Sequence, residues 1–375
     1  MPQVFNWQIG REMDYPYEAA YPKQQFAAVF DINKCIACQT CTFACKYAWT
    51  SGRGQEYMFW NNVETKPYGF YPLGWDVRLL EMLGPQTWEA GKYTGKTIFE
   101  AAQPDHVALG FLPEDEDWAQ PNLGEDESAG TIEKGAFFGI PHPVWMFYLQ
   151  RICNHCTYPA CLASCPRKAI YKRQEDGIVL IDESRCRGYR ECVRNCPYKK
   201  TLYNTVTRVT EKCVGCYPLV EQGKQTNCVQ ACIGRIRVNG WIHFPDKVVP
   251  DNPVDFLVHV RKVALPLYPQ FGLNVNIYYI PPIHVPPVYT QQMFGPGVEQ
   301  AIKTYRNVAN DPELLGVLML MGATDRWIEH FRVRGDEAIG YDAKGAEIAR
   351  VPLKEPVYIR EAFDQARQVY RHNIT

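Results

Sequence analysis

Cysteine is the residue type in this chain whose number and spacing can do chemistry. All 15 cysteines fall into four tight groups, with none between Cys45 and Cys153 and none after Cys232. Each group opens with a three-residue step and closes with C-x3-C, an internal repeat of four. Grouped cysteines at these spacings indicate metal ligands, because a disulfide framework would spread its pairs through a short secreted chain. The groups are Cys35, Cys38, Cys41 and Cys45; Cys153, Cys156, Cys161 and Cys165; Cys186, Cys192 and Cys196; and Cys213, Cys216, Cys228 and Cys232.

Tyr189 occupies the place of a cysteine in the third group. The first group follows the bacterial ferredoxin spacing C-x2-C-x2-C-x3-C, and it superposes on the third with Tyr189 opposite Cys38. Fifteen ligands therefore divide into three clusters with four thiolates and one with three. A cubane corner without a thiolate loses its iron easily, which predicts three 4Fe–4S clusters and one 3Fe–4S cluster. We interpret Tyr189 as an aromatic plug over the 3Fe–4S face; a phenolate ligand and an open, substrate-binding iron are the alternatives.

Iron suits these loops better than zinc. Two-residue spacers let consecutive soft thiolates wrap one cluster while backbone N–H groups face its sulfides. In two-cluster ferredoxins the fourth cysteine of a run ligates the other cluster, so four runs predict two such modules. The second and fourth groups, taken alone, would each pass as a zinc ribbon. Fifteen cysteines leave one zinc site short, however, and His155 is not needed as a ligand beside four cysteines.

The elements that must position the cysteine loops follow from the apolar runs beside them. Runs ending in Asp at residues 26–31 and 177–182 predict strands that deliver the chain into the first and third groups. Residues 166–182 predict two strands around a Glu-Asp-Gly turn. We expect the closing cysteine of each group to open a short helix, and residues 312–333 to form a packing helix.

The composition argues against a nucleic-acid-binding protein and against a membrane-spanning chain. The net charge is −1, from 40 basic and 41 acidic residues, which argues against a nucleic-acid partner. The N-terminal 20 residues contain neither the apolar core of a signal peptide nor a twin arginine, so we expect no export address on this chain. The longest uncharged stretch, 263–298, holds seven prolines and is not a membrane helix. We therefore expect a soluble chain that meets a membrane only through partners.

Three further segments have two interpretations each. Four arginines crowd the third group, where they would either raise the potential of a cluster or form a solvated basic face. Residues 97–133 contain ten acidic and no basic residues, which indicates a solvated loop or a docking surface for a basic partner. Residues 265–289 are rich in proline and tyrosine, and we expect an arm over another subunit or a lid over the chain's own clusters. The four arginines are Arg185, Arg187, Arg190 and Arg194.

The cysteine segments resemble those of a known family. "CRGYRECVRNCPYKK", "EKCVGCYP" and "RICNHCTYPACLASCPRKAIYKR" resemble the iron–sulfur β subunits of type II molybdenum enzymes of the dimethyl-sulfoxide reductase superfamily. Within that family, "GQEYMFWNNVETKPYG", "ALPLYPQFG", "QMFGPGVEQAI" and "EPVYIR" are most similar to the β subunit of nitrite oxidoreductase.

The resemblance implies four sets of cluster ligands, numbered here from the molybdenum subunit outward. Sets one to three would hold 4Fe–4S clusters, and set four a 3Fe–4S cluster facing a haem b subunit, with Tyr189 a non-ligand at the open corner. Set one is Cys35, Cys38, Cys41 and Cys232; set two is Cys45, Cys213, Cys216 and Cys228; set three is Cys153, Cys156, Cys161 and Cys196; set four is Cys165, Cys186 and Cys192.

The resemblance also implies a function. The chain would relay electrons between a molybdopterin (bis-MGD) catalytic α subunit, which carries its own 4Fe–4S cluster, and a haem b γ subunit, with no catalytic residue of its own. The reaction expected is nitrite to nitrate, with electrons leaving through the 3Fe–4S end. The alternatives are a nitrate, perchlorate or selenate reductase, an ethylbenzene or dimethylsulfide dehydrogenase, an open-cluster lyase, or clusters that only staple the fold. Co-export with the partner would place the chain on the extracytoplasmic face of a membrane; the cytoplasmic face is the alternative.

The expected fold is α+β, with two ferredoxin-like modules, long loop-rich insertions and a C-terminal extended arm. One module is discontinuous and holds groups one and four; the other holds groups two and three. The expected boundaries are an N-terminal arm at 1–30, the first module at 31–67 with 201–245, an acidic insertion at 68–145, the second module at 146–200, and a partner-binding arm with helices at 246–375.

Overall fold

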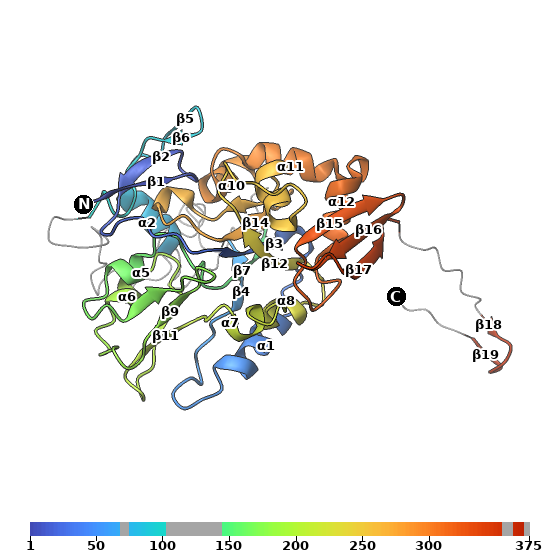
Figure 1. Cartoon of the computed structure of the whole chain (residues 1–375), viewed down its shortest axis with the longest axis horizontal. Helices are drawn as coiled ribbons and strands as arrows, with labels where there is room; N and C mark the ends of the chain where they lie inside the picture. The colour runs from blue at the N-terminus through green and yellow to red at the C-terminus, as the bar shows by residue number, and fades with distance from the viewer. Residues whose placement is uncertain (68–74, 103–144, 355–362, 371–375) are drawn as a thin grey trace, which may run out of the picture.

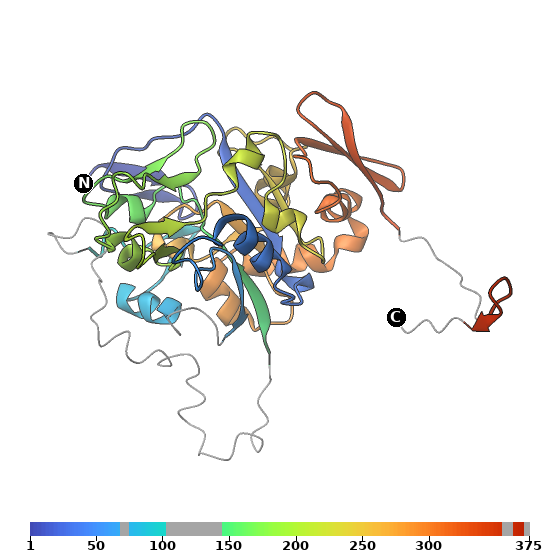
Figure 2. The same cartoon turned by 90° about the horizontal axis from the view of Figure 1, so that it is seen from below.

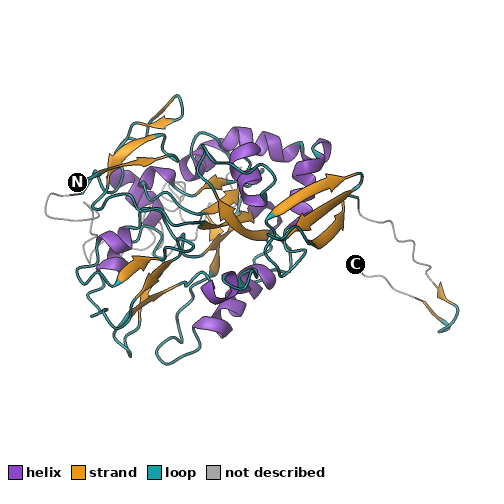
Figure 3. Ribbon diagram, viewed as in Figure 1, coloured by secondary structure: helices purple, strands orange, loops and turns teal. Residues whose placement is uncertain are grey.

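The computed structural model describes residues 1–67, 75–102, 145–354 and 363–370 (Figure 1). Helices and strands are both short and are joined by long loops (Figure 3), as expected for an α+β fold rich in cysteine loops. Of the acidic insertion predicted at 68–145, the structure describes only residues 75–102 and residue 145. Most of the acidic run at 97–133 therefore lies outside the described residues.

Each cysteine group lies between a strand that enters it and a strand that leaves it. The strands that enter are β3 (Gln25–Asp31), β7 (Phe147–Arg151), β9 (Val179–Ile181) and β11 (Thr210–Lys212). Those that leave are β4 (Asn62–Lys66), β8 (Ile170–Lys172), β10 (Thr201–Tyr203) and β12 (Arg237–Ile242). The strands predicted before the first and third groups, and the strand pair after the second, are confirmed.

The strand that leaves one group pairs antiparallel with the strand that enters the next. β4 pairs with β7, β8 with β9, and β10 with β11. The last strand, β12, returns to the first, β3, with Arg237 opposite Phe30. The four groups are thus linked in a closed ring of strand pairs.

Short helices carry the cysteine at the third of the four repeat positions in each group. Cys41 lies in α1 (Thr40–Trp49), Cys161 in α5 (Ala160–Ala163), Cys192 in α6 (Glu191–Asn195) and Cys228 in α8 (Asn227–Gln230). The prediction that the closing cysteine opens a helix is wrong, because that cysteine lies inside α1, at the end of α6, or just after α5 and α8. Residues four apart share one face of a helix, so a C-x3-C step is itself spanned by a helical turn.

A four-stranded sheet at the centre of the molecule is buried on both faces. Its order is β12-β3-β14-β13, with β14 (Ile277–Ile280) parallel to β3 and β13 (Leu265–Pro266) at the edge. Alternate residues of β3 and β14 point to opposite faces, so Phe30 and Tyr279 enter one core while Val29 and Tyr278 enter the other. Burial of both faces explains the uninterrupted apolar run before the first cysteine group.

Most of the segment 265–289 belongs to this core, whereas Pro286, Pro287 and Val288 at its end are exposed. Leu267, Phe271, Val275 and Ile277 are 0–1% exposed within the chain itself. An extended apolar segment needs a surface to cover, and here that surface is the chain's own sheet.

The N-terminal residues fold as a hairpin and not as a free arm. β1 (Gln3–Asn6) pairs with β2 (Arg11–Asp14), and Ile9 and Met13 are fully buried. The Gln8 side-chain amide exchanges two hydrogen bonds with the Val275 backbone, at 2.8 and 3.0 Å. The hairpin is therefore fastened to the segment that leads into β14.

The second core is built by the C-terminal elements on the far face of the sheet. Helix α12 (Pro312–Leu320) confirms only the first part of the helix predicted over 312–333, because Gly322 adopts a φ of +66° and the chain then enters β15 (His330–Arg334). β15 pairs with β16 (Glu337–Tyr341), and β16 with β17 (Glu347–Pro352); Figures 1 and 2 place this sheet at one end of the described body. None of the buried residues of this second core is a cysteine.

The remaining described elements flank these parts. They are α2 (Trp75–Leu83), β5 (Trp88–Glu89), β6 (Lys92–Tyr93), α7 (Tyr217–Val220), α9 (Pro253–Asp255), α10 (Pro287–Phe294), α11 (Val298–Arg306), β18 (Phe363–Asp364) and β19 (Val369–Tyr370).

We predict that the buried ion pair between β4 and α2 stabilises the fold. Lys66 Nζ lies 2.7 Å from Asp76 Oδ2, both side chains are at most 1% exposed, and the Tyr268 hydroxyl also donates to Asp76. Asp76→Asn removes the carboxylate charge that faces the buried Lys66 ammonium, so it should lower the free energy of unfolding by roughly 3–5 kcal/mol. Chemical denaturation followed by circular dichroism measures the change. In the exposed pair of Arg261 with Glu313, Glu313→Gln should cost less than about 1 kcal/mol; equal losses would contradict the prediction.

Candidate metal centres

The four cysteine loops share one backbone conformation. The second residue after the first cysteine of each group has a positive φ: 53° at Ala37, 42° at His155, 66° at Gly188 and 60° at Gly215. A left-handed residue at this place turns the chain so that successive N–H groups can face a common anionic centre. The repeat seen in the cysteine spacing therefore extends to the fold of the loops.

Set two surrounds a small cavity. Cys45, Cys213, Cys216 and Cys228 all line it, together with apolar side chains that include Phe26, Trp49 and Ile152. Cys45 comes from α1 and Cys228 from α8, while the other two come from the loop after β11.

Two N–H groups point at the sulfurs of set two. Trp49 Nε1 donates to Cys216 Sγ at 3.2 Å, and the Gly215 N–H donates to Cys213 Sγ at 3.4 Å. Burial, with Cys228 nearby, raises the pKa of the Cys216 thiol to about 11.

Set three surrounds a second cavity of the same kind. Its four cysteines, Cys153, Cys156, Cys161 and Cys196, all line it, although they come from two different groups. Burial is the main cause that raises the pKa of Cys156 well above its usual value, and Cys153, Cys161 and Cys196 raise it further.

Set one gathers near the guanidinium of Arg237. Nη2 of Arg237 donates to Cys41 Sγ at 3.0 Å, and the charges of Cys35 and Cys232 also act on this guanidinium. Cys38 is the outlying member: it is exposed, and a hydrogen bond from the Thr40 hydroxyl lowers its pKa.

Set four has two half-buried thiols, Cys165 and Cys186, and one buried thiol, Cys192. Burial raises the pKa of Cys192 to about 12, and Cys165 and Cys186 contribute to the rise. The Ala169 N–H donates to Cys165 Sγ at 3.3 Å, and the Thr210 N–H to Cys186 Sγ at 3.4 Å.

Tyr189 lies at the surface beside set four. Its side chain is 61% exposed, and its counterpart in the first group, Cys38, is also exposed. The next residues, Arg190 and Gln39, are both left-handed, with φ of 66° and 60°, and both begin a helix. Tyr189 and Cys38 therefore occupy the same outward corner of corresponding loops.

The thiols fit a polynuclear metal cluster. All 15 cysteines are free of disulfides, and ten or more lie in buried or half-buried positions that disfavour an unpartnered thiolate. The cysteines of sets two and three surround cavities and do not converge on a point; among the described residues, no three His, Cys, Asp or Glu side chains are spaced for a single metal ion. Iron–sulfur clusters, with thiolates at several corners, match this arrangement.

Of the two interpretations of the four arginines near the third group, the structure agrees with a solvated face. Arg185, Arg187, Arg190 and Arg194 are all exposed, as in the solvated-face interpretation, and Arg185 pairs with Asp182. Arg237 was missed, although it is the largest fully buried side chain. The available signal was a charged residue at the start of the otherwise uncharged strand segment "RVNGWI".

His155 is not placed as a ligand. It is fully buried, and its Nδ1 accepts a hydrogen bond from the Val179 N–H at 3.1 Å. Three other histidines also have protein partners: His243 with Asp255, His259 with the His243 carbonyl, and His284 with the Met146 carbonyl.

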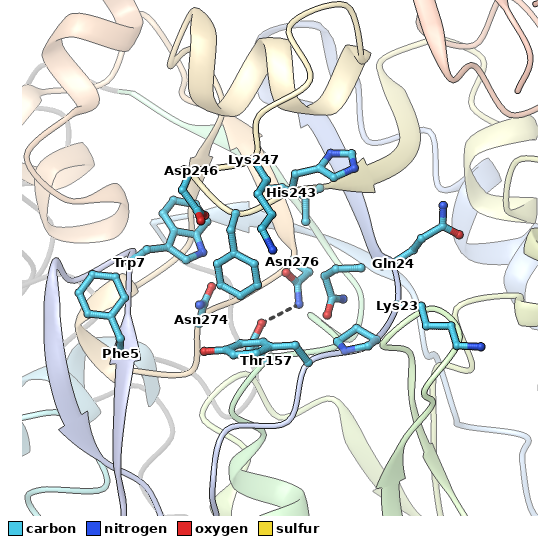
Figure 4. A pocket seen from close by; sticks show the side chains of 15 residues that line it. Phe5, Trp7, Lys23, Gln24, Thr157, His243, Asp246, Lys247, Asn274 and Asn276 are labelled. Atoms are coloured by element: carbon cyan, nitrogen blue, oxygen red, sulfur yellow. Dashed lines mark hydrogen bonds between the residues drawn. The ribbon is translucent and has the colours of Figure 1, made fainter.

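A larger cavity of about 450 Å³ lies away from the cysteines. Phe5, Trp7 and Phe244 form aromatic walls, and none of its lining residues is a cysteine. The Lys247 side chain extends toward the middle of the pocket, and Lys23 lies at its side (Figure 4). Asn276, in its wall, donates to the His155 carbonyl at 2.8 Å, which connects this cavity to the second cysteine loop. It carries none of the predicted ligands.

Comparison with known proteins agrees with the geometry. A family model described as a 4Fe-4S dicluster domain matches residues 144–241, which include groups two to four. The chain is 39% identical to the chlorate reductase subunit beta of Ideonella dechloratans and 40% identical to the selenate reductase subunit beta of Thauera selenatis, in each case over 81% of this chain and 99% of the relative. It is 31% identical to the respiratory nitrate reductase 1 beta chain of Escherichia coli, over 70% of each.

No helix in the described ranges is both long and apolar enough to span a bilayer. Four repeated cysteine loops, cavities lined by thiols, and these similarities together identify the chain. It belongs to the iron–sulfur β subunits of the dimethyl-sulfoxide-reductase family of molybdenum enzymes, the electron-transfer subunits of nitrate, chlorate and selenate reductase-type complexes.

Proposed function

We propose that this chain holds three 4Fe–4S clusters on sets one, two and three and one 3Fe–4S cluster on set four, and that they form a single line of electron transfer. The observation that carries the proposal is that the four cysteines of set two, and those of set three, each line one cavity although they come from separate groups. Bound clusters would supply one-electron relay centres. The chain's own residues hold, bury and hydrogen-bond the ligand sulfurs.

Neighbouring sets adjoin in the order one to four. Arg237 is close to Cys41 of set one and to Cys228 of set two. After burial, Cys153 of set three is the largest cause that raises the pKa of Cys213 in set two. Cys192 of set four packs in one buried cluster with Cys161 of set three, and it adds to the rise in the pKa of Cys161 after the larger effects of burial, Cys196 and Cys153. A linear relay needs this succession, since each electron passes only between adjacent centres.

The two-module architecture is part of the proposal. Helix α1 packs on α8, and α5 packs on α6, so groups one and four face each other, as do groups two and three. The closing cysteine Cys45 would then ligate a cluster with cysteines of the fourth group, and Cys196 a cluster with cysteines of the second group, as in two-cluster ferredoxins. The modules would comprise 31–67 with 201–245, and 146–200. The terminal segments 1–30 and 246–375 would support them and face partners.

The partners proposed are a molybdopterin catalytic α subunit with its own 4Fe–4S cluster, and a haem b γ subunit. Relatives named as β subunits of chlorate, selenate and nitrate reductases support an α partner. The haem subunit, the extracytoplasmic location by co-export, and nitrite as the substrate rest on the sequence resemblance. Set one would face the molybdenum subunit and set four the haem.

The substrate is tested on the purified complex. We expect oxidation of nitrite to nitrate with an artificial electron acceptor, and slower reduction of chlorate or selenate with a reduced dye. A complex that reduces chlorate or selenate and leaves nitrite unchanged would contradict the nitrite assignment while keeping the relay. Non-haem iron analysis on the same sample should give about nineteen irons per complex: fifteen on the β chain, from three clusters of four and one of three, and four in the α subunit's own cluster.

We predict that Tyr189→Cys converts the cluster of set four to a 4Fe–4S cluster. The new thiol would occupy the corner that Cys38 occupies in the first group, and the exposed position tolerates a smaller side chain. Iron content should rise by one atom per chain, and the electron paramagnetic resonance (EPR) signal of the oxidised 3Fe–4S cluster should disappear.

Tyr189→Phe is the matched control, because it keeps the aromatic ring and adds no ligand. It should leave the iron content and the signal unchanged. An unchanged 3Fe–4S signal in Tyr189→Cys, with the other clusters intact, would show that residue 189 does not lie at the open corner.

We also predict that iron removal unfolds one part of the chain selectively. The cysteine loops have cavities at their centres and lose their cross-links without metal, whereas α12 and β15–β17 pack in a core that contains no cysteine. Hydrogen exchange of the chelated protein should show loss of protection of at least tenfold in residues 145–242 and little change in residues 312–352. Uniform loss across both regions would contradict this division.

A further inference from the structure

Arg237 is a buried cation without a carboxylate partner among the described residues. It is the first residue of β12, is 1% exposed, and forms no ion pair in the described parts of the chain. The other deeply buried arginine, Arg151, is 3% exposed and is neutralised by Glu64 at 2.5 Å. A charge buried in this way needs a countercharge nearby, which directs attention to what surrounds the Arg237 guanidinium.

The surroundings of Arg237 are one aromatic ring and a group of thiols. Its guanidinium carbon lies 4.5 Å from the centre of the Phe30 ring, its neighbour across the β12–β3 pair. Nη2 donates to Cys41 Sγ at 3.0 Å, while Nε and Nη1 are buried with no hydrogen-bond partner in the described protein. Two of its N–H-bearing atoms are therefore free to serve a group held between the cysteines.

The thiols around Arg237 belong to two ligand sets. Burial acts to lower the pKa of Arg237, but the negative charges of Cys41, Cys228, Cys232 and Cys35 raise it overall. In return, Arg237 opposes the rise that burial causes in the pKa of Cys228. Cys228 belongs to set two and the other three to set one. Cys228 packs in the same buried cluster as Cys41, to which Arg237 donates, so the guanidinium lies where the two sets meet.

We propose that Arg237 is a shared positioning residue for sets one and two, whose charge favours the reduced state of both clusters. The proposal rests on the ligand sets proposed above. Reduction adds negative charge to a cluster, and a fixed cation in a low-dielectric interior stabilises that added charge. Hydrogen bonds to ligand sulfur act in the same direction. The cysteines of sets three and four do not contact Arg237, so the potentials of their clusters should depend on it much less.

The test is an EPR-monitored redox titration of the intact complex. Arg237→Gln removes the charge at similar length, and Arg237→Lys keeps the charge. The matched control is Arg235→Gln, which deletes the same charge two residues away from an exposed side chain. Iron content is measured on every sample, so that loss of a cluster is not mistaken for a shift in potential.

In Arg237→Gln, we expect the ratio of reduced to oxidised cluster at fixed ambient potential to fall at least tenfold for sets one and two. For a one-electron couple this is a shift of about 59 mV to lower potential. Sets three and four should shift by less than a third of that. Arg237→Lys should restore most of the change, and Arg235→Gln should match the wild type.

Unchanged potentials in an Arg237→Gln complex that contains all its clusters would overturn the proposed role of Arg237 and leave the proposed ligand sets unaffected. Equal shifts in all four clusters would also overturn it, since they would indicate a general structural effect. A wild-type complex that lacks the cluster of set one or set two would instead overturn the ligand sets themselves.

A second measurement uses the wild-type complex, so it tests the proposal even if the Arg237→Gln complex does not assemble. In wild-type complex labelled with ¹⁵N-arginine, pulsed EPR of the reduced set-one cluster should detect a nitrogen coupling from the hydrogen bond to Cys41. Absence of that coupling would overturn the proposal. The coupling should persist in Arg235→Gln.

Discussion

The repulsion between buried thiolates is the constraint on which this structure depends. Fifteen cysteines are brought together from four stretches of chain, and all but the exposed Cys38 lie in buried or half-buried positions, where an unpartnered thiolate is disfavoured. Iron supplies the positive charge that lets these sulfurs lie side by side. The strand pairs and short helices are arranged to bring the sulfurs of separate groups to common cavities.

The cysteine loops could be predicted from the sequence because their structure is local. A spacing of two or four residues fixes which thiols can share a centre, and the apolar runs before Cys35 and Cys186 were recognisable as strands. The family could be recognised for the same reason. Even here the positions of the short helices were wrong. The closing cysteine of a C-x3-C step was expected to begin a helix, but the step forms a helical turn that lies inside the helix or at its end.

The parts that were missed depend on contacts between distant segments. An apolar, proline-rich run such as 265–289 must cover something, and the sequence does not say whether that surface is another subunit or the chain's own sheet. The same holds for Arg237. Its burial comes from the pairing of β12 with β3, across some two hundred residues, whereas the four arginines close to Cys186 and Cys192 in sequence face the solvent.

The closed ring of strand pairs also bears on how the protein is made. Strand β3 precedes the first cysteine group, yet its partner β12 is more than two hundred residues later. Cysteines 153–196 lie within a short stretch of chain, so the loops of the inner two groups can meet early in synthesis. The first and fourth groups can be joined through β3 and β12 only after residues 237–242 have left the ribosome, so any cluster that these two groups share is completed after that point.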